Sequence, residues 1–310
     1  MATRRNFLTG GAAFMAAGLA TGLSPLARAW AGAALDLGGG ASVQTLHDGN
    51  LVLPGSFVYG DSPEEQAKAI IARYGLNPNQ LEPDCNVTLY RDGTNTVIFD
   101  VGSGPDFMST AGKLPEALDQ LGLAAEDVTH VIFTHGHPDH LWGLLDDFDE
   151  PFFANAQHMM GQAEFDYWTD ENTLSTIGQA RQTFAAGAKR RLDMIADRMS
   201  FFRDGEEIVP GVAARATFGH TPGHMSYEIR KGSESVMVLG DCIANHHLAF
   251  EQPGWHSGSD QDGDLGAKTR VALLDQLAQE QMRFIGFHLP HPGFGRAERK
   301  DGAYRFVAEA

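Results

Sequence analysis

Four apolar runs in this chain each end in residues that can bind a metal ion, and this repeated pattern limits the fold more than any other feature. After the first run, residues 134–140 read THGHPDH. A straight strand would point alternate side chains to opposite faces, whereas a tight turn with glycine and proline can bring imidazoles and a carboxylate together. The other runs end at His220, Asp241 and His288. Because open α/β sheets bind ligands beyond the carboxyl ends of their strands, we expect all four groups to meet at one sheet edge.

This order of residues resembles the metallo-β-lactamase superfamily, whose signature is His-x-His-x-Asp-His followed by a lone His, a lone Asp and a last His. The resemblance runs from about Val43 to the C-terminus and implies an α/β (α+β layered) fold, the αββα sandwich. It is strongest to the methyl parathion hydrolase-like branch, in HTPGH at 220–224, LGD at 239–241 and GAYRFV at 302–307. Many quorum-quenching lactonases carry a Tyr three positions after the bridging Asp, where this chain has Ala244.

The resemblance implies a site for two divalent metal ions. The residues that match the ligands of the first metal are His135, His137 and His220. The residues that match the ligands of the second metal are Asp139, His140 and His288, with Asp241 matching the carboxylate that bridges both. Zinc is the metal that we expect, and Mn, Fe, Co or Ni would accept the same ligands.

Two further residues are expected to support these ligands without binding metal. Asp100 ends the apolar run 97–99 and matches a buried Asp behind the metal loop. His224 follows His220 in HTPGH, and the family pattern makes the first of the two the ligand. His291 is the competing candidate for the last ligand, but His288 directly ends its apolar run.

Two metal ions about 3.5–4 Å apart would turn a shared water into a hydroxide nucleophile near neutral pH. We therefore expect a hydrolase with Asp139 and Asp241 as its catalytic carboxylates, Asp139 moving a proton to the leaving group. Trp142, Phe107 and Trp168 are the candidates for an aromatic pocket around the metals. Such a pocket suits a small neutral substrate, an ester, lactone or organophosphotriester, better than a peptide.

Two other functions remain open from the sequence. A mononuclear iron redox enzyme of the persulfide dioxygenase type uses a similar framework, and metal count with oxygen consumption would identify it. A non-catalytic metal-binding periplasmic protein would bind metal but turn over no substrate.

Charge and the N-terminus predict where the protein acts. A net charge of −17 argues against nucleic acid or an anionic membrane as partner. Arg4 and Arg5 precede a Gly/Ala-rich apolar run and a small-residue cleavage site, so residues 1–31 are predicted to be a twin-arginine signal peptide. We expect the twin-arginine machinery to export the chain to the periplasm. Residues 32–310 are expected to form a single hydrolase domain, which has no stable association with the membrane after cleavage. A retained anchor helix and a homodimer are both left open.

Hydrophobic patterns predict the remaining elements. The strands are expected at 86–91, 95–100, 128–134, 212–218, 225–230 and 235–239, with a final strand at 283–287. The helices are expected at 113–121, 157–168, 177–197 and 265–279, and long loops at 172–176 and 245–264. The loop at 245–264 is rich in Gly, Asp and His and is a candidate border of the active site. Cys85 and Cys242 match no metal or redox spacing, and a disulfide between them is left open.

Overall fold

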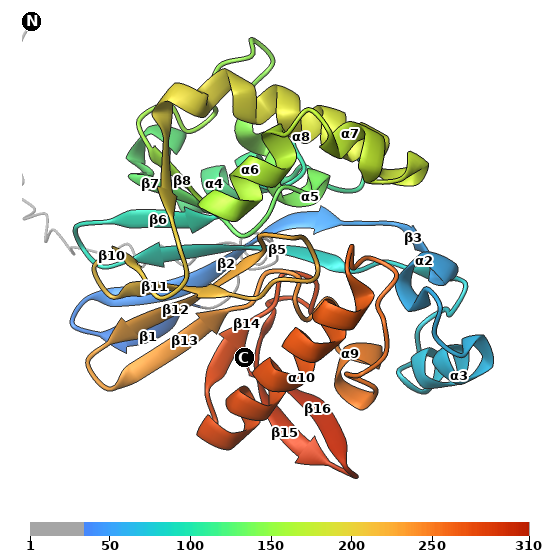
Figure 1. Cartoon of the computed structure of the whole chain (residues 1–310). Helices are drawn as coiled ribbons and strands as arrows, with labels where there is room; N and C mark the ends of the chain where they lie inside the picture. The colour runs from blue at the N-terminus through green and yellow to red at the C-terminus, as the bar shows by residue number, and fades with distance from the viewer. Residues whose placement is uncertain (1–33, 310) are drawn as a thin grey trace, which may run out of the picture.

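The protein folds into two packed β-sheets with helices on both outer faces (Figure 1). This computed structural model describes residues 34–309, so the predicted signal peptide lies outside the described residues. The first sheet, in spatial order, contains β1 Leu35–Gly38, β2 Ala41–Asn50, β5 Asp84–Arg91, β6 Thr96–Phe99, β7 His130–Phe133, β8 Gln157–Gly161 and β9 Met199–Phe202. The second contains β10 Glu207–Val209, β11 Val212–Ala216, β12 Met225–Lys231, β13 Glu234–Val238, β14 Arg283–Ile285, β15 Phe294–Lys300 and β16 Ala303–Ala308.

The helices form the two outer layers and one side piece. Over the first sheet lie α4 Leu114–Leu121, α5 Pro138–Leu141, α6 Gln162–Thr169, α7 Thr173–Thr176 and α8 Gln182–Ile195 (Figure 1). Against the second sheet lie α9 Leu248–Glu251 and α10 Gly263–Glu280. The side piece contains β3 Leu53–Pro54, α2 Gly55–Tyr59, α3 Glu64–Arg73 and β4 Gln80–Leu81. The predicted αββα sandwich is confirmed.

Three apolar layers hold these elements together. Val43, Phe99 and Ile132 of the first sheet pack with Val212 and Tyr227 of the second. Separate clusters fill the space between each sheet and its helices. Among the central strands, β6 (TVIF), β7 (HVIF) and β13 (ESVMV) each contain at least three consecutive apolar residues, which is why these runs were readable in the sequence.

The parallel strands determine where the site forms. β6, β7, β8 and β9 run parallel, as do β13 and β14. Consequently the residues that follow β6, β7, β13 and β14 emerge at the same edge of the sandwich, as open α/β sheets place their ligands.

Four predicted elements differ in the structure. The helix expected at 157–168 begins as strand β8, because a short buried apolar run has the same composition in a strand and in a helix. The strand expected to be last is followed by β15 and β16. The loops expected at 172–176 and 245–264 contain the short helices α7 and α9.

Cys85 and Cys242 are buried free thiols, so the disulfide left open by the sequence is not formed. None of the helices among residues 34–309 has both the length and the apolar content needed to cross a membrane.

Candidate metal centre

The turn between β7 and α5 carries most of the candidate ligands. Asp100 fixes its start, because the carboxylate accepts from Thr134 N and from Thr134 Oγ1, each at 2.7 Å. Pro138 begins α5, where its missing N–H costs no helical hydrogen bond. In the middle, Gly136 N donates to the buried carboxylate of Glu164 at 2.9 Å. Hydrogen bonds between protein groups therefore fix the shape of this turn.

Three imidazoles converge in the first group. Nε2 of His135 lies 3.0 Å and Nε2 of His220 lies 2.9 Å from Nδ1 of His137. Burial and the neighbouring histidines hold the pKa of His135 and of His137 well below the usual value. This direction favours the neutral ring, the form in which a histidine binds a metal.

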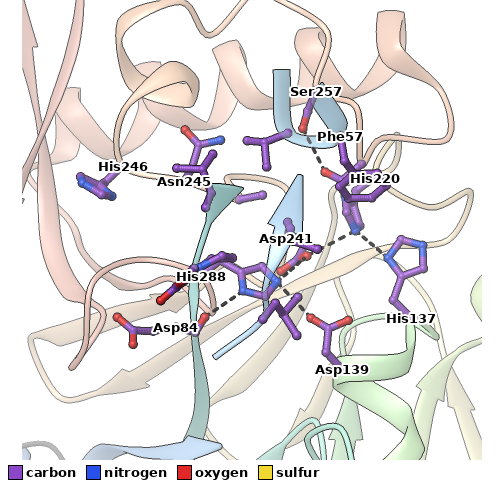
Figure 2. A pocket seen from close by; sticks show the side chains of 18 of the residues that line it. Phe57, Asp84, His137, Asp139, His220, Asp241, Asn245, His246, Ser257 and His288 are labelled. Carbon is purple, nitrogen blue, oxygen red and sulfur yellow. Dashed lines mark hydrogen bonds and ion pairs between the residues drawn. The ribbon is translucent and has the colours of Figure 1, made fainter. Parts of the chain in front are cut away.

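A second group of four side chains contains Asp139, His140, Asp241 and His288, three of which are labelled in Figure 2 beside His137 and His220. Asp139 Oδ2 is 3.1 Å from Nε2 of His288, and Asp241 Oδ1 is 3.3 Å from Nε2 of His140. Asp241 Oδ2 lies 3.3 Å from His288 Nε2 and 3.4 Å from His220 Nε2. Asp241 thus reaches both groups, the position that a bridging carboxylate needs.

The donor atoms of each group fit a divalent cation. Within each group they lie within 4.8 Å of one another. Asp139 Oδ2, His140 Nε2 and Asp241 Oδ1 are buried and accept or donate no hydrogen bond within the described chain. Buried polar atoms are almost always hydrogen-bonded, whereas these three meet only one another and His288, at ion-pair distances, which fits a site with a cation among them. Histidine nitrogens and carboxylate oxygens are ligands for zinc and its neighbours.

The outer nitrogens of three rings are held by neighbours, which fixes their orientation. His140 Nδ1 donates to Asp100 at 2.8 Å and His288 Nδ1 donates to the backbone oxygen of Asp84 at 2.8 Å. His135 Nδ1 lies 3.0 Å from Oγ1 of Thr134. Asp100 thereby supports one ring directly and a second through a hydroxyl.

His224 lies behind the groups rather than among the converging donors. Its Nε2 accepts from the backbone N of Asp241 at 2.9 Å, and its Nδ1 lies 2.8 Å from Thr217 Oγ1. Burial, with His220 nearby, lowers the pKa of His224 to about 3, which keeps this ring a neutral acceptor. His224 therefore holds the backbone of Asp241. His291 bonds to Asn86 and also stays outside both groups.

Two buried carboxylates of this region were not predicted. Glu164 on α6 accepts from the β7–α5 turn and also from the backbone N of Gly223, so it links two ligand-bearing loops. Asp260 lies 3.2 Å from Nδ1 of His220. The sequence offered one signal, since Asp260 belongs to the loop that was expected to border the site.

A cavity of about 240 Å³ opens above the two groups. Its floor contains His137, Asp139, His220, Asp241 and His288. Its apolar wall contains Leu51, Leu53, Phe57, Val58, Phe107 and Phe184. Most of this wall comes from the side piece and from α8, which cover the carboxyl edge of the first sheet.

Of the three predicted aromatic pocket residues, only Phe107 lines the cavity. The prediction is wrong for Trp142 and Trp168. Trp142 turns toward α8, where its ring packs on Gly187 and under the guanidinium of Arg191. Trp168 is fully buried and donates to Glu164. Proximity in sequence to the metal loop placed Trp142 near the site, but its ring points away from the cavity.

Comparison with known proteins agrees with this geometry. A family model described as the metallo-beta-lactamase superfamily matches residues 82–285. An uncharacterized protein of Mycobacterium bovis is 25% identical over 235 residues, which cover 75% of this chain and 94% of that protein. The N-acyl homoserine lactonase AiiB of Agrobacterium fabrum is 23% identical over 213 residues, covering 62% and 74%.

Two solved structures share the fold over nearly their whole length. AidC, a dizinc quorum-quenching lactonase, superposes with a TM-score of 0.83 at 23% identity and covers 91% of this chain and 98% of its own. The hydrolase AbOPH of the beta lactamase superfamily superposes with a TM-score of 0.82 at 26% identity, covering 89% and 97%.

Proposed function

Because the chain belongs to the metallo-β-lactamase superfamily, we propose that it is a hydrolase that uses two divalent metal ions, zinc first among them, to cleave small neutral substrates. The observation that carries this proposal is the pair of converging donor groups on the floor of one cavity. The ligands would be the seven residues of those groups. A single metal would leave one complete group of buried donors without a partner, which argues against the mononuclear iron alternative.

Bound there, two divalent cations would supply a nucleophile at neutral pH and polarise the oxygen of the substrate. The protein's own residues would hold the metal centre in place and handle the proton of the leaving group. Asp241 would hold the two halves of the centre in register, since it contacts histidines of both. Asp139 lines the cavity and would hold the proton that the leaving group takes.

The cavity wall supports esters, lactones or organophosphotriesters as the substrate class. Its upper part is aliphatic and aromatic, which favours an uncharged ligand. Arg181 is the one Lys or Arg among the described residues that line it, and the backbone oxygens of Gly258 and Ser259 accept from its guanidinium. AiiB and AidC are named lactonases and AbOPH is named a hydrolase, which agrees with this class.

Elemental analysis and a substrate panel on the same preparation test the proposal. We expect about two metal ions per chain, hydrolysis of at least one neutral ester, lactone or phosphotriester, and loss of that activity after chelation. Residual turnover in fully stripped protein would contradict the metal-dependent chemistry. One iron per chain with oxygen uptake on a persulfide would establish the redox alternative, and full metal loading without any turnover would establish the binding-protein alternative.

We also propose that the chain is exported to the periplasm by the twin-arginine machinery, although the signal lies outside the described residues. The support is the pair Arg4 and Arg5 before the apolar run. Replacing both with Lys should leave the full-length precursor in the cytoplasm, which cell fractionation would detect. Equal periplasmic amounts of the variant and the wild type would contradict this route. A homodimer stays a prediction that sedimentation can check.

A further inference from the structure

We propose that the loop of residues 257–262 positions two of the three imidazoles of the first group, through Asp260 for His220 and through Gln261 for His137. The inference rests on the proposed metal-dependent function. It concerns residues that neither the metal-loop motif nor the lone ligands of the sequence point to.

Asp260 is placed to fix the tautomer of His220. Its Oδ1 lies 3.2 Å from His220 Nδ1, and its side chain is 1% exposed. When Nδ1–H donates to this carboxylate, the lone pair of Nε2 faces the first group, which is the form that a metal requires. Arg270 balances the buried charge, with its Nη1 3.2 Å from Asp260 Oδ2. A carboxylate behind a ligand histidine typically makes that ligand more basic.

Gln261 is placed to do the same for His137. Its side-chain amide lies 3.4 Å from Nε2 of His137, while Nδ1 of that ring faces the first group. The amide also accepts from Tyr167 Oη at 2.5 Å. A metal on Nδ1 of His137 requires the tautomer with a proton on Nε2. If the Gln261 amide is rotated by half a turn, its oxygen accepts from His137 Nε2–H and its nitrogen donates to Tyr167 Oη, so both contacts are kept.

Backbone bonds hold this loop against the turn that carries His220. Gln261 N donates to the backbone oxygen of His220, and Asp262 N donates to that of Gly219, each at 3.0 Å. These bonds join the two loops, so a shift of residues 257–262 would displace the His220 ring.

Arg181 and the side piece fix the other end of the loop. Arg181 Nη2 donates to the backbone oxygens of Gly258 at 2.8 Å and Ser259 at 3.0 Å. A Cβ on Gly258 would lie 1.9 Å from the backbone oxygen of Phe57, so the loop touches the cavity wall at this point. Ser257 and Ser259 of this loop line the same cavity as Phe57 and His220 (Figure 2). The loop of residues 257–262 thus links the cavity wall at Phe57 to the orientation of the His220 ring.

Cobalt titration of the stripped full-length protein tests the inference, because the visible spectrum of Co²⁺ reports its ligand geometry independently of activity. In Asp260→Ala we expect one of the two cobalt ions to bind about 10- to 100-fold more weakly, with a changed spectrum. The other ion should bind as in the wild type. Asp260→Asn keeps an acceptor for His220 and should restore part of the affinity. Arg190→Ala is the control, because Arg190 lies on α8, is exposed and pairs with Asp149.

Equal cobalt affinity in wild type and Asp260→Ala would overturn the inference, as would equal weakening of both ions. Asp260→Ala leaves Arg270 without its carboxylate partner and could fail to fold. In that case Gln261→Met tests the inference instead, since Gln261 is only half-buried. Weaker binding of one ion in Gln261→Met supports the inference, and unchanged binding overturns it. A wild-type protein that binds no cobalt would instead overturn the proposed function itself.

Discussion

Replacing Glu164 should separate the two loops that carry the first group of ligands. Its Oε1 accepts from Gly136 N at 2.9 Å and from Trp168 Nε1 at 2.5 Å. Its Oε2 accepts from Thr221 Oγ1 at 2.7 Å and from Gly223 N at 2.9 Å. Three of these four donors are fixed, because only the threonine hydroxyl can rotate and become an acceptor.

The number of fixed donors determines the expected loss. Glu164→Gln keeps one carbonyl oxygen, so one backbone N–H faces an NH₂ group and the free energy of unfolding should fall by about 1–3 kcal/mol. Burial, partly opposed by these hydrogen bonds, raises the pKa of Glu164, so removing the charge recovers some desolvation cost and favours the lower end. Glu164→Leu leaves three fixed donors without an acceptor, a loss of about 3–9 kcal/mol against a typical total of about 5–15 kcal/mol.

Urea unfolding of metal-free protein, followed by circular dichroism, measures these losses without a contribution from bound metal. Glu116→Gln on the exposed face of α4 is the control and should stay within about 0.5 kcal/mol of wild type. The reasoning fails if Glu164→Leu unfolds at the wild-type urea concentration, or if the Gln variant loses as much as the Leu variant.

Three further outcomes are expected. Asp139→Asn should retain metal and slow substrates with poor leaving groups most; equal slowing of activated and poor leaving groups would exclude the proton role. Gly187→Ala places a Cβ 2.4 Å from the Trp142 ring and should cost about 1–3 kcal/mol, which Trp142→Phe should partly relieve in the double variant. Burial, with Arg198 nearby, lowers the pKa of His158 from 6.5 to about 4. The neutral ring therefore contributes its full stability above pH 6.5. As the pH falls toward 4, the free energy of unfolding should decrease by about 3 kcal/mol. His158→Leu should flatten that decline in urea unfolding measured across this range, and an unchanged slope would refute the assignment.

The resemblance carried by the sequence motifs predicted the layered fold, and the motifs themselves predicted the residues that the structure gathers into the two donor groups. The reason is local. His135, His137, Asp139 and His140 lie within six residues of chain, so one turn suffices to bring them together. The remaining donors each follow an apolar run, and parallel strands carry their ends to one edge whatever the details of packing.

Tertiary structure alone decided the cavity wall and the supporting residues. Phe57 and Phe184 line the same cavity although more than 100 positions separate them in the chain. Trp142 lies two residues after the metal loop, yet its ring packs against Gly187 outside the cavity. Asp260 lies in a loop without hydrophobic periodicity, and its contact with His220 depends on where α10 and the side piece hold that loop. Side-chain direction and long-range contact follow from packing, which residue spacing does not encode.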